Sequence, residues 1–143
     1  MTMQEAEQAY RAVLEFLGGI WERTRQPGDL AFFCSIASYT PGVGTADPAM
    51  WSDWLAALKK VQDGVVLPDP ERGSLPLDSL KPPEPEQAYL AMFSYVEEYW
   101  ERISRPADIG DLLGQMRYTP GAGTADPSMW QRWLAAIDKV RAT

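Results

Sequence analysis

Histidine is absent from this chain of 143 residues, and cysteine occurs once, at Cys34. Without histidine the chain can form neither a Ser-His-Asp triad nor a Cys-His pair, and it offers no imidazole to a metal ion. A lone cysteine excludes an internal disulfide, so a reducing compartment is the simplest interpretation. We therefore expect no enzyme, no catalytic residue, no metal and no cofactor. Carboxylate acid–base or carboxylate–metal chemistry is the one enzymatic route left open.

Positive charge is also scarce, with 13 Lys and Arg against 20 Asp and Glu and a net charge of −7. Such a surface repels nucleic-acid phosphates and anionic lipids and attracts basic partners. The sequence has no apolar run of about 18 residues, the length a membrane-spanning helix needs. Residues 1–7 are polar and acidic, unlike a signal peptide. We expect a cytoplasmic protein that binds neither nucleic acid nor membrane.

The sequence contains a tandem duplication. Residues 7–61 (the first copy) align without a gap with residues 86–140 (the second copy) at an offset of 79, and roughly half of the aligned positions are identical. The longest match is the loop Tyr-Thr-Pro-Gly-x-Gly-Thr-Ala-Asp-Pro, which begins at Tyr39 and again at Tyr118. A gapless match of this extent indicates duplication of a unit of about 60 residues.

The duplication divides the chain into a first helical repeat at residues 1–62, a linker at 63–85 and a second repeat at 86–143. The linker holds six of the twelve prolines, which favour extended structure. Its valines and leucines predict that it lies over apolar surface, with a disordered tether as the alternative. Because a lone unit of about 60 residues buries little core, we expect the repeats to form one compact unit.

Hydrophobic spacing predicts three helices in each copy. Apolar residues recur every three or four positions from Tyr10 to Trp21 and from Tyr89 to Trp100, as in amphipathic helices. The expected boundary residues are Pro27 and Pro106 after the first helix, Asp29 and Asp108 as N-caps of the second, and Asp47 and Asp126 as N-caps of the third. No alternating pattern of strand length occurs. The predicted fold is all-α, with two tandem three-helix repeats packed as a pseudo-symmetric helical bundle.

The copies differ in their first and second helices. Gly18-Gly19 interrupts the first helix where the second copy has Glu97-Glu98, at a cost of roughly 1 kcal/mol per glycine relative to alanine. Residues 30–36 are apolar almost all round, so the second helix of the first copy is expected to be deeply buried, with Cys34 as a small core residue.

The glycine-containing loop before each third helix has two interpretations. Glycines before a helix N-terminus can bind phosphate. However, the loop has no lysine or arginine, and Asp47 and Asp126 bring negative charge to the N-cap positions. Turn formation explains the loop better, because proline fixes φ and glycine adopts positive φ.

Four motifs of the second copy together resemble small bacterial immunity proteins. They are Gln-Ala-Tyr-x-Ala-Met-Phe, Tyr-x-x-x-Tyr-Trp-Glu-Arg, Asp-Ile-Gly-Asp-Leu-Leu-Gly-x-Met and Gly-Thr-Ala-Asp-Pro-x-Met-Trp-x-x-Trp-Leu-x-Ala. Immunity proteins of this kind accompany polymorphic toxins, among them contact-dependent growth-inhibition and Rhs-type effectors. The first copy departs from the pattern at Gly18-Gly19 and at residues 31–34. The duplication departs from it too, since members of the family carry one copy, and it leaves open which copy meets the toxin.

The resemblance implies an immunity protein that binds a cognate toxin domain and neutralises it by stoichiometric occlusion of its active site or an adjacent surface. Many such toxins have basic clefts, which an acidic inhibitor can occupy. The candidate toxin-binding residues are Glu97, Glu98, Glu101, Asp111, Tyr118, Thr119 and Asp126, with Tyr39, Thr40 and Asp47 as first-copy equivalents. We expect a monomer when the protein is free.

Two alternatives stay open. The carboxylates of Glu97, Glu98 and Glu101 can form a solvent-exposed helix face without binding a partner. The alternative function is a non-catalytic helical interaction or regulatory module that binds another partner, through the groove between the two copies.

Overall fold

The computed structural model describes residues 1–25 and 28–143, and Pro27 lies outside the described residues. Regular structure within these ranges is helical apart from two short hairpins, which confirms the all-α prediction. The helices are α1 (Met3–Thr24), α2 (Asp29–Ala37), α3 (Pro48–Asp63), α4 (Asp69–Arg72), α5 (Pro85–Arg102), α6 (Ala107–Met116) and α7 (Pro127–Ala142), with a 3-10 turn η1 at Leu77–Ser79. The strands are β1 (Tyr39–Thr40), β2 (Gly44–Thr45), β3 (Tyr118–Thr119) and β4 (Gly123–Thr124).

The third helix of each copy starts as the sequence predicts. The Asp47 carboxylate accepts a hydrogen bond from the Ala49 N–H at 3.0 Å, and Asp126 accepts from the Ser128 N–H at 3.0 Å. Proline occupies the first turn of both helices, where its missing N–H costs nothing. Each cap stabilises its helix by about 1 kcal/mol.

The predicted N-caps of the second helices are wrong. Helix α2 begins at Asp29 itself and α6 begins at Ala107, and neither Asp29 nor Asp108 caps its own helix. Instead, Oδ2 of Asp108 accepts a hydrogen bond from the Leu30 N–H at 2.9 Å. Because α2 packs against α6, a carboxylate of the second copy reaches a free N–H of α2 and caps a helix of the first copy.

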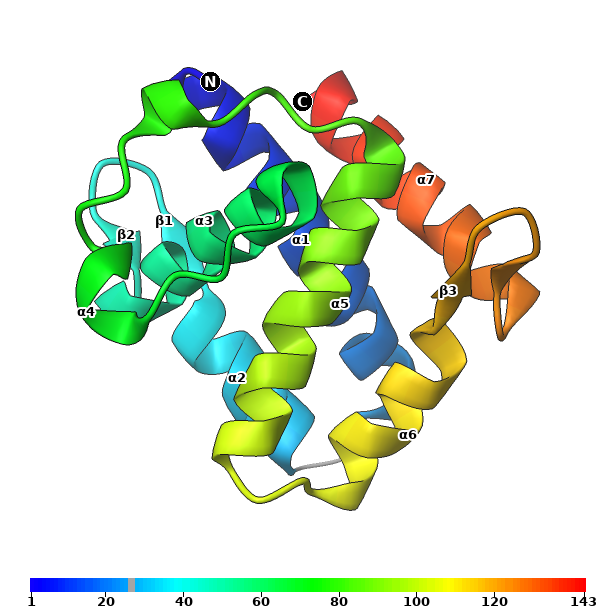
Figure 1. The fold of residues 1–143 in the computed structure, drawn as a ribbon. Helices are drawn as coiled ribbons and strands as arrows, with labels where there is room; N and C mark the ends of the chain where they lie inside the picture. The colour runs from blue at the N-terminus through cyan, green and yellow to red at the C-terminus, as the bar shows by residue number, and fades with distance from the viewer. Residues whose placement is uncertain (26–27) are drawn as a thin grey trace.

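The main helix pairs join one copy to the other. Helix α1 packs against α7, and α3 packs against α5 (Figure 1). Buried side chains from both copies form one hydrophobic cluster, in which the rings of Tyr10, Trp54, Tyr89 and Trp133 are fully enclosed. The core is therefore shared between the repeats rather than divided into two.

Helix α2 is buried on one face only, so the prediction of a deeply buried helix is wrong for the other face. Leu30, Phe33 and Ala37 point into the core, whereas Phe32 is 58% exposed. The helix packs against α1, α3 and α6. These neighbours cover one side of α2 and leave Phe32 outside.

The glycine-containing loops form hairpins that the sequence pattern did not predict as strands. Tyr39 pairs with Thr45 and Tyr118 pairs with Thr124 in two antiparallel ladders. Two-residue strands are too short to show alternation. Gly42 and Gly121 turn the chain with φ of 80° and 84°, in agreement with the turn interpretation.

The linker packs along the helices through several anchors. The side chain of Leu80 is buried, and the amino group of Met1 donates hydrogen bonds to the carbonyl oxygens of Leu77 and Leu80. Gln62 donates to the Lys81 carbonyl at 2.7 Å. The segment before α5 crosses the upper end of the molecule, near both chain ends (Figure 1).

Candidate functional site

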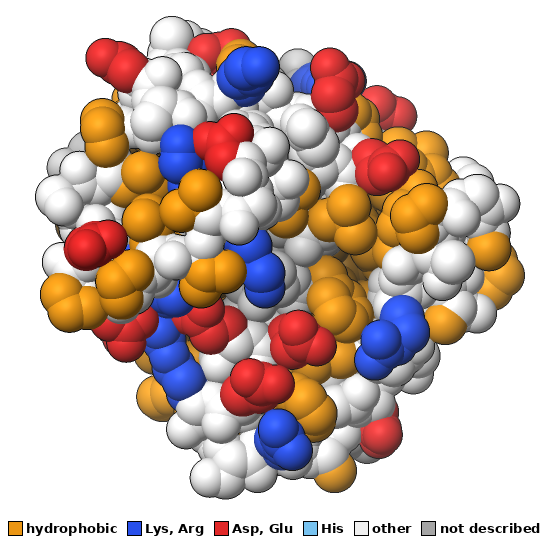
Figure 2. All heavy atoms as spheres, in the orientation of Figure 1, with side chains coloured by type: hydrophobic (Ala, Val, Ile, Leu, Met, Phe, Trp, Pro, Cys, Tyr) orange, Lys and Arg blue, Asp and Glu red, His pale blue; other side chains and the backbone are white. Residues whose placement is uncertain are grey.

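Helices α5 and α6 carry the acidic candidates of the second copy. Glu97 and Glu101 are four residues apart on α5, so they share one face of that helix. Glu97 has no ion-pair partner among the described residues, and Glu101 approaches only Arg105, at 3.9 Å. Figure 2 shows acidic side chains over the lower part of α5. These carboxylates are available to a basic partner.

Asp111 and Asp126 line the same shallow hollow, which has a volume of about 470 Å³ between α6 and the start of α7. Hydrogen bonds from the hydroxyl and backbone N–H of Ser128 lower the pKa of Asp126, so its carboxylate stays charged. The structure thus brings together two candidates that lie 15 positions apart in the sequence.

The two hairpins hold the remaining candidates, but on different sides of the molecule. Figure 1 shows β1–β2 and β3 on opposite sides of α5. Tyr39 packs on Trp51 with ring centroids 5.4 Å apart, and Tyr118 packs on Trp130 at 5.6 Å. One contact with a partner therefore cannot use both loops as a single surface.

The exposed threonines occupy corresponding places in the two hairpins. Thr40 and Thr119 each end the first strand of their hairpin and point to solvent. Asp47 is exposed at the start of α3, where it serves as the N-cap. These first-copy residues form a second, separate acidic and polar surface.

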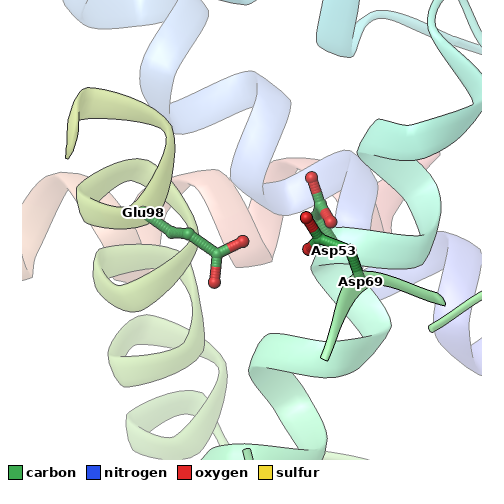
Figure 3. A group of neighbouring side chains, drawn as sticks. All are labelled: Asp53, Asp69 and Glu98. Atoms are coloured by element: carbon green, nitrogen blue, oxygen red, sulfur yellow. The ribbon is translucent and has the colours of Figure 1, made fainter. Parts of the chain in front are cut away.

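Glu98 belongs to a different structure, an ion-pair network that joins three helices. Figure 3 shows Glu98 on α5 facing Asp53 on α3 and Asp69 on α4. Arg72 donates to Glu98 and, at 2.9 Å, to Asp53. Arg102 donates to Asp53 at 2.7 Å, to Glu98 at 2.8 Å and to Asp69 at 2.9 Å.

Two guanidinium groups therefore occupy the position that a cation would need between these carboxylates. In the described ranges, Asp53, Asp69 and Glu98 are the one group of three acidic side chains close enough to share an ion. The hydrogen bonds that Arg72 donates to Glu98 and Asp53 outweigh burial and raise the pKa of Arg72. The cluster fixes the linker to α3 and α5, which accounts for its charges without a metal ion.

Sequence reasoning missed Arg72, which is 9% exposed. The one feature of the sequence that could have indicated this ion-pair network is a single arginine in an acidic, proline-rich segment. Its partners Asp53 and Glu98 lie on other helices, 19 and 26 positions away, and hydrophobic periodicity says nothing about such pairs.

An apolar hollow lies beside the acidic part of α5. Figure 2 shows hydrophobic side chains gathered in a depression between α5 and α7. Half-buried Phe93 on α5 and half-buried Trp130 and Leu134 on α7 pack against the core. The guanidinium of Arg117 lies over the Phe93 ring, 5.9 Å from its centroid.

Comparisons with protein-family models, with curated proteins and with solved structures gave no match to this chain. None of the described helices combines the length and the apolar character that crossing a lipid bilayer requires.

Proposed function

We propose that this chain is a cytoplasmic immunity protein that binds a cognate bacterial toxin domain and blocks it without catalysis. The motifs of the second copy support the family assignment. The observation that carries the proposal in this structure is the set of carboxylates on α5 and α6, Glu97, Glu101 and Asp111, that lack a strong internal partner among the described residues. The copies act as one pseudo-symmetric unit in this proposal.

The mechanism is electrostatic. A net charge of −7 accelerates encounter with a basic toxin, and the carboxylates replace substrate phosphates in its cleft. Glu98 contributes less than its neighbours, because Arg72 and Arg102 already hold it. Asp126 extends the surface beyond Asp111, with which it shares a hollow.

The test uses the toxin domain encoded beside this gene. We expect one-to-one binding that weakens as salt rises, and protection of cells that produce the toxin. The triple substitution Glu97→Gln, Glu101→Gln and Asp111→Asn should weaken binding at least about tenfold and flatten the salt dependence.

A matched control removes three exposed carboxylates elsewhere, with Glu71→Gln, Asp78→Asn and Asp138→Asn. This variant has the same net charge as the test variant and should bind with nearly wild-type affinity. Equal loss in both variants would show that only overall charge matters, and failure of the wild type to protect cells would refute the immunity proposal.

The alternative function is a helical interaction module that docks a different protein on the apolar hollow between α5 and α7. The half-buried Phe93 on α5 and the half-buried Trp130 and Leu134 on α7, the two helices that border the hollow, favour it. Binding through this hollow would be insensitive to salt and lost on Phe93→Ala, whereas the acidic triple substitution would leave it unchanged.

A further inference from the structure

The helix pair α3–α5 and the helix pair α1–α7 form two corresponding grooves. Five helix residues line the first groove: Ala56, Ala57, Lys60, Ser94 and Glu98. Their counterparts at the 79-residue offset all line the second groove: Ala135, Ala136, Lys139, Glu15 and Gly19. Corresponding side chains also meet across each groove, since Lys60 donates to Ser94 at 3.1 Å and Lys139 donates to Glu15 at 2.6 Å.

The linker covers only the first groove. Val66, Leu67 and Arg72 lie over it and leave a cavity of about 30 Å³. We call it the linker-covered groove. The second groove is lined solely by residues of α1 and α7 and has a volume of about 200 Å³. No described segment of the chain lies over it, and we call it the open groove.

The two grooves differ in charge at the positions that hold Arg72. Asp53 and Glu98 hold the Arg72 guanidinium in the linker-covered groove. Their counterparts in the open groove are Arg132 and Gly19, so these two carboxylates are lost and a cation is gained. Glu15, at the position of Ser94, adds one carboxylate, which Lys139 holds.

Two arginines of the open groove form no salt bridge in the described part of the chain, although the charge of Arg132 helps to lower the pKa of Asp126. Arg23 and Arg132 both line it, whereas the carboxylate of Glu15 in the same lining is already paired with Lys139 at 2.6 Å. Burial and the nearby charge of Arg132 lower the pKa of Arg23, as expected for two cations that share a site. Such a pair favours a carboxylate, which two guanidinium groups can bind through charge-assisted hydrogen bonds.

We propose that the open groove binds a short acidic segment of a partner polypeptide, seated as residues 66–72 are seated in the linker-covered groove, with a carboxylate in place of the Arg72 guanidinium. Apolar side chains of that segment line the groove together with the alanines of α7, as Val66 and Leu67 do with those of α3. The site is separate from the acidic surface on α5 and α6 and attracts the opposite charge, so it does not rest on the toxin-binding proposal.

Gly19 keeps the open groove accessible. A Cβ atom at this position would meet no atom within 4 Å, so packing does not require glycine. Glycine within a helix is destabilising relative to other residues. A ligand that approaches α1 closely at this point explains the glycine, because the counterpart Glu98 would fill the same space.

The probe is a fluorescent peptide with the sequence of residues 64–75 that carries Arg72→Glu, and the matched probe keeps Arg72. With the full chain, the Glu-containing peptide should bind saturably and at least about tenfold more tightly than the Arg-containing peptide. Equal affinity of the two peptides, or no saturable binding of the Glu-containing peptide up to about 1 mM, overturns the proposal.

The protein variants locate the site. Gly19→Glu places a carboxylate beside Arg23 and Arg132 and should weaken binding of the Glu-containing peptide at least about tenfold. Gly18→Glu adds the same charge outside the groove lining and should leave binding unchanged. Thermal unfolding of both variants checks the fold, and identical peptide affinities in the two variants contradict the assignment.

A gain of binding provides the stricter test. Gly19→Glu combined with Arg132→Asp gives the open groove the two carboxylates that hold Arg72 in the linker-covered groove. The double variant should then prefer the peptide that keeps Arg72, and an unchanged preference for the Glu-containing peptide overturns the proposal.

Discussion

The hydroxyl oxygens of Tyr10 and Tyr95 lie 2.8 Å apart in the core, and the Tyr10 hydroxyl donates to the Ala37 carbonyl at 2.7 Å. Because the hydroxyl proton of Tyr10 is used in the hydrogen bond to Ala37, the Tyr10 oxygen accepts a hydrogen bond from the Tyr95 hydroxyl. In the second copy, Tyr89 likewise donates to a backbone carbonyl, at 2.8 Å. However, the residue that packs beside Tyr89 at the position corresponding to Tyr95 is Phe16 of the first copy, which has no hydroxyl. The duplicated core sites therefore differ by one buried hydrogen bond.

This difference predicts unequal costs for two similar substitutions. Tyr10→Phe removes the donor to Ala37 and the acceptor for Tyr95, so we expect a loss of about 2–3 kcal/mol in the free energy of unfolding. Tyr95→Phe copies the Phe16 arrangement and should cost about 1 kcal/mol or less. Equilibrium urea unfolding at neutral pH measures both values. A greater loss in Tyr95→Phe than in Tyr10→Phe would contradict donation from Tyr95 to Tyr10 and from Tyr10 to Ala37.

The sequence predicts which residues are buried better than it predicts what covers them. The repeat places Tyr10 and Tyr89 in equivalent core positions, and Asp-Pro marks the start of each third helix. Periodicity identifies the apolar face of α1, but it cannot show that α7, from the other copy, packs on that face. Partner choice depends on three-dimensional fit between segments far apart in the chain.

The same limit applies to the acidic candidates. Glu97 and Glu98 are neighbours of identical chemistry, and the sequence gives no reason to separate them. About 100° of helical rotation turns Glu98 toward Arg72 and Arg102, while Glu97 has no such partner in the described part of the chain. Two adjacent glutamates therefore differ in role because of a linker arginine that sequence reasoning passed over.

The hydrogen bond from the Leu30 N–H to Asp108 predicts that a residue of α6 stabilises α2. Asp108→Ala should lower the free energy of unfolding by about 1 kcal/mol, because one N–H of α2 loses its cap. Asp111→Ala on the same helix is the control and should have no cost, since alanine has the higher helix propensity. Urea unfolding of the two variants decides the matter, and equal stability of the two would contradict a capping role for Asp108.

Burial raises the pKa of the Cys34 thiol to about 11 from an ordinary value of 9.0. Near pH 8 the folded protein should therefore be alkylated by iodoacetamide at least about tenfold more slowly than the urea-unfolded protein, because less thiolate is present. Since Cys34 is the sole cysteine, the reaction reports on one site. Equal rates in the folded and unfolded protein would contradict this prediction.

The same raised pKa of Cys34 fixes the sign of a stability change. The folded protein holds the thiol proton more tightly than the unfolded chain, so stability is lost as the pH rises from about 9 toward 11. Cys34→Ala should reduce this alkaline loss, which urea unfolding at a series of pH values measures. A loss of the same size in the variant would assign the effect to the buried tyrosines instead.

The ion pairs of Arg72 predict that this residue stabilises the contact between the linker and helices α3 and α5. Arg72→Met leaves Asp53 and Glu98 facing each other with Arg102 as their one remaining cation. Because Glu98 is 38% exposed, we expect a loss of about 2 kcal/mol in the free energy of unfolding, below that of a fully buried pair. Arg25→Met is the control, since its ion pair with Glu22 is exposed and should contribute at most about 0.5 kcal/mol. A loss in Arg72→Met no larger than in the control would contradict a structural role for the network.

The same substitution tests whether arginine, rather than a metal ion, balances the three carboxylates Asp53, Asp69 and Glu98. In the wild type the guanidinium groups already occupy the carboxylate oxygens, so millimolar calcium should leave the midpoint of thermal unfolding unchanged. Arg72→Met frees oxygen ligands of the kind that calcium prefers, and calcium should then raise the midpoint by a few degrees. Sodium chloride at equal ionic strength separates specific binding from screening. A calcium-dependent rise of the same size in the wild type would mean that the cluster takes up a cation with Arg72 in place, and the arginine could no longer be regarded as its counter-charge.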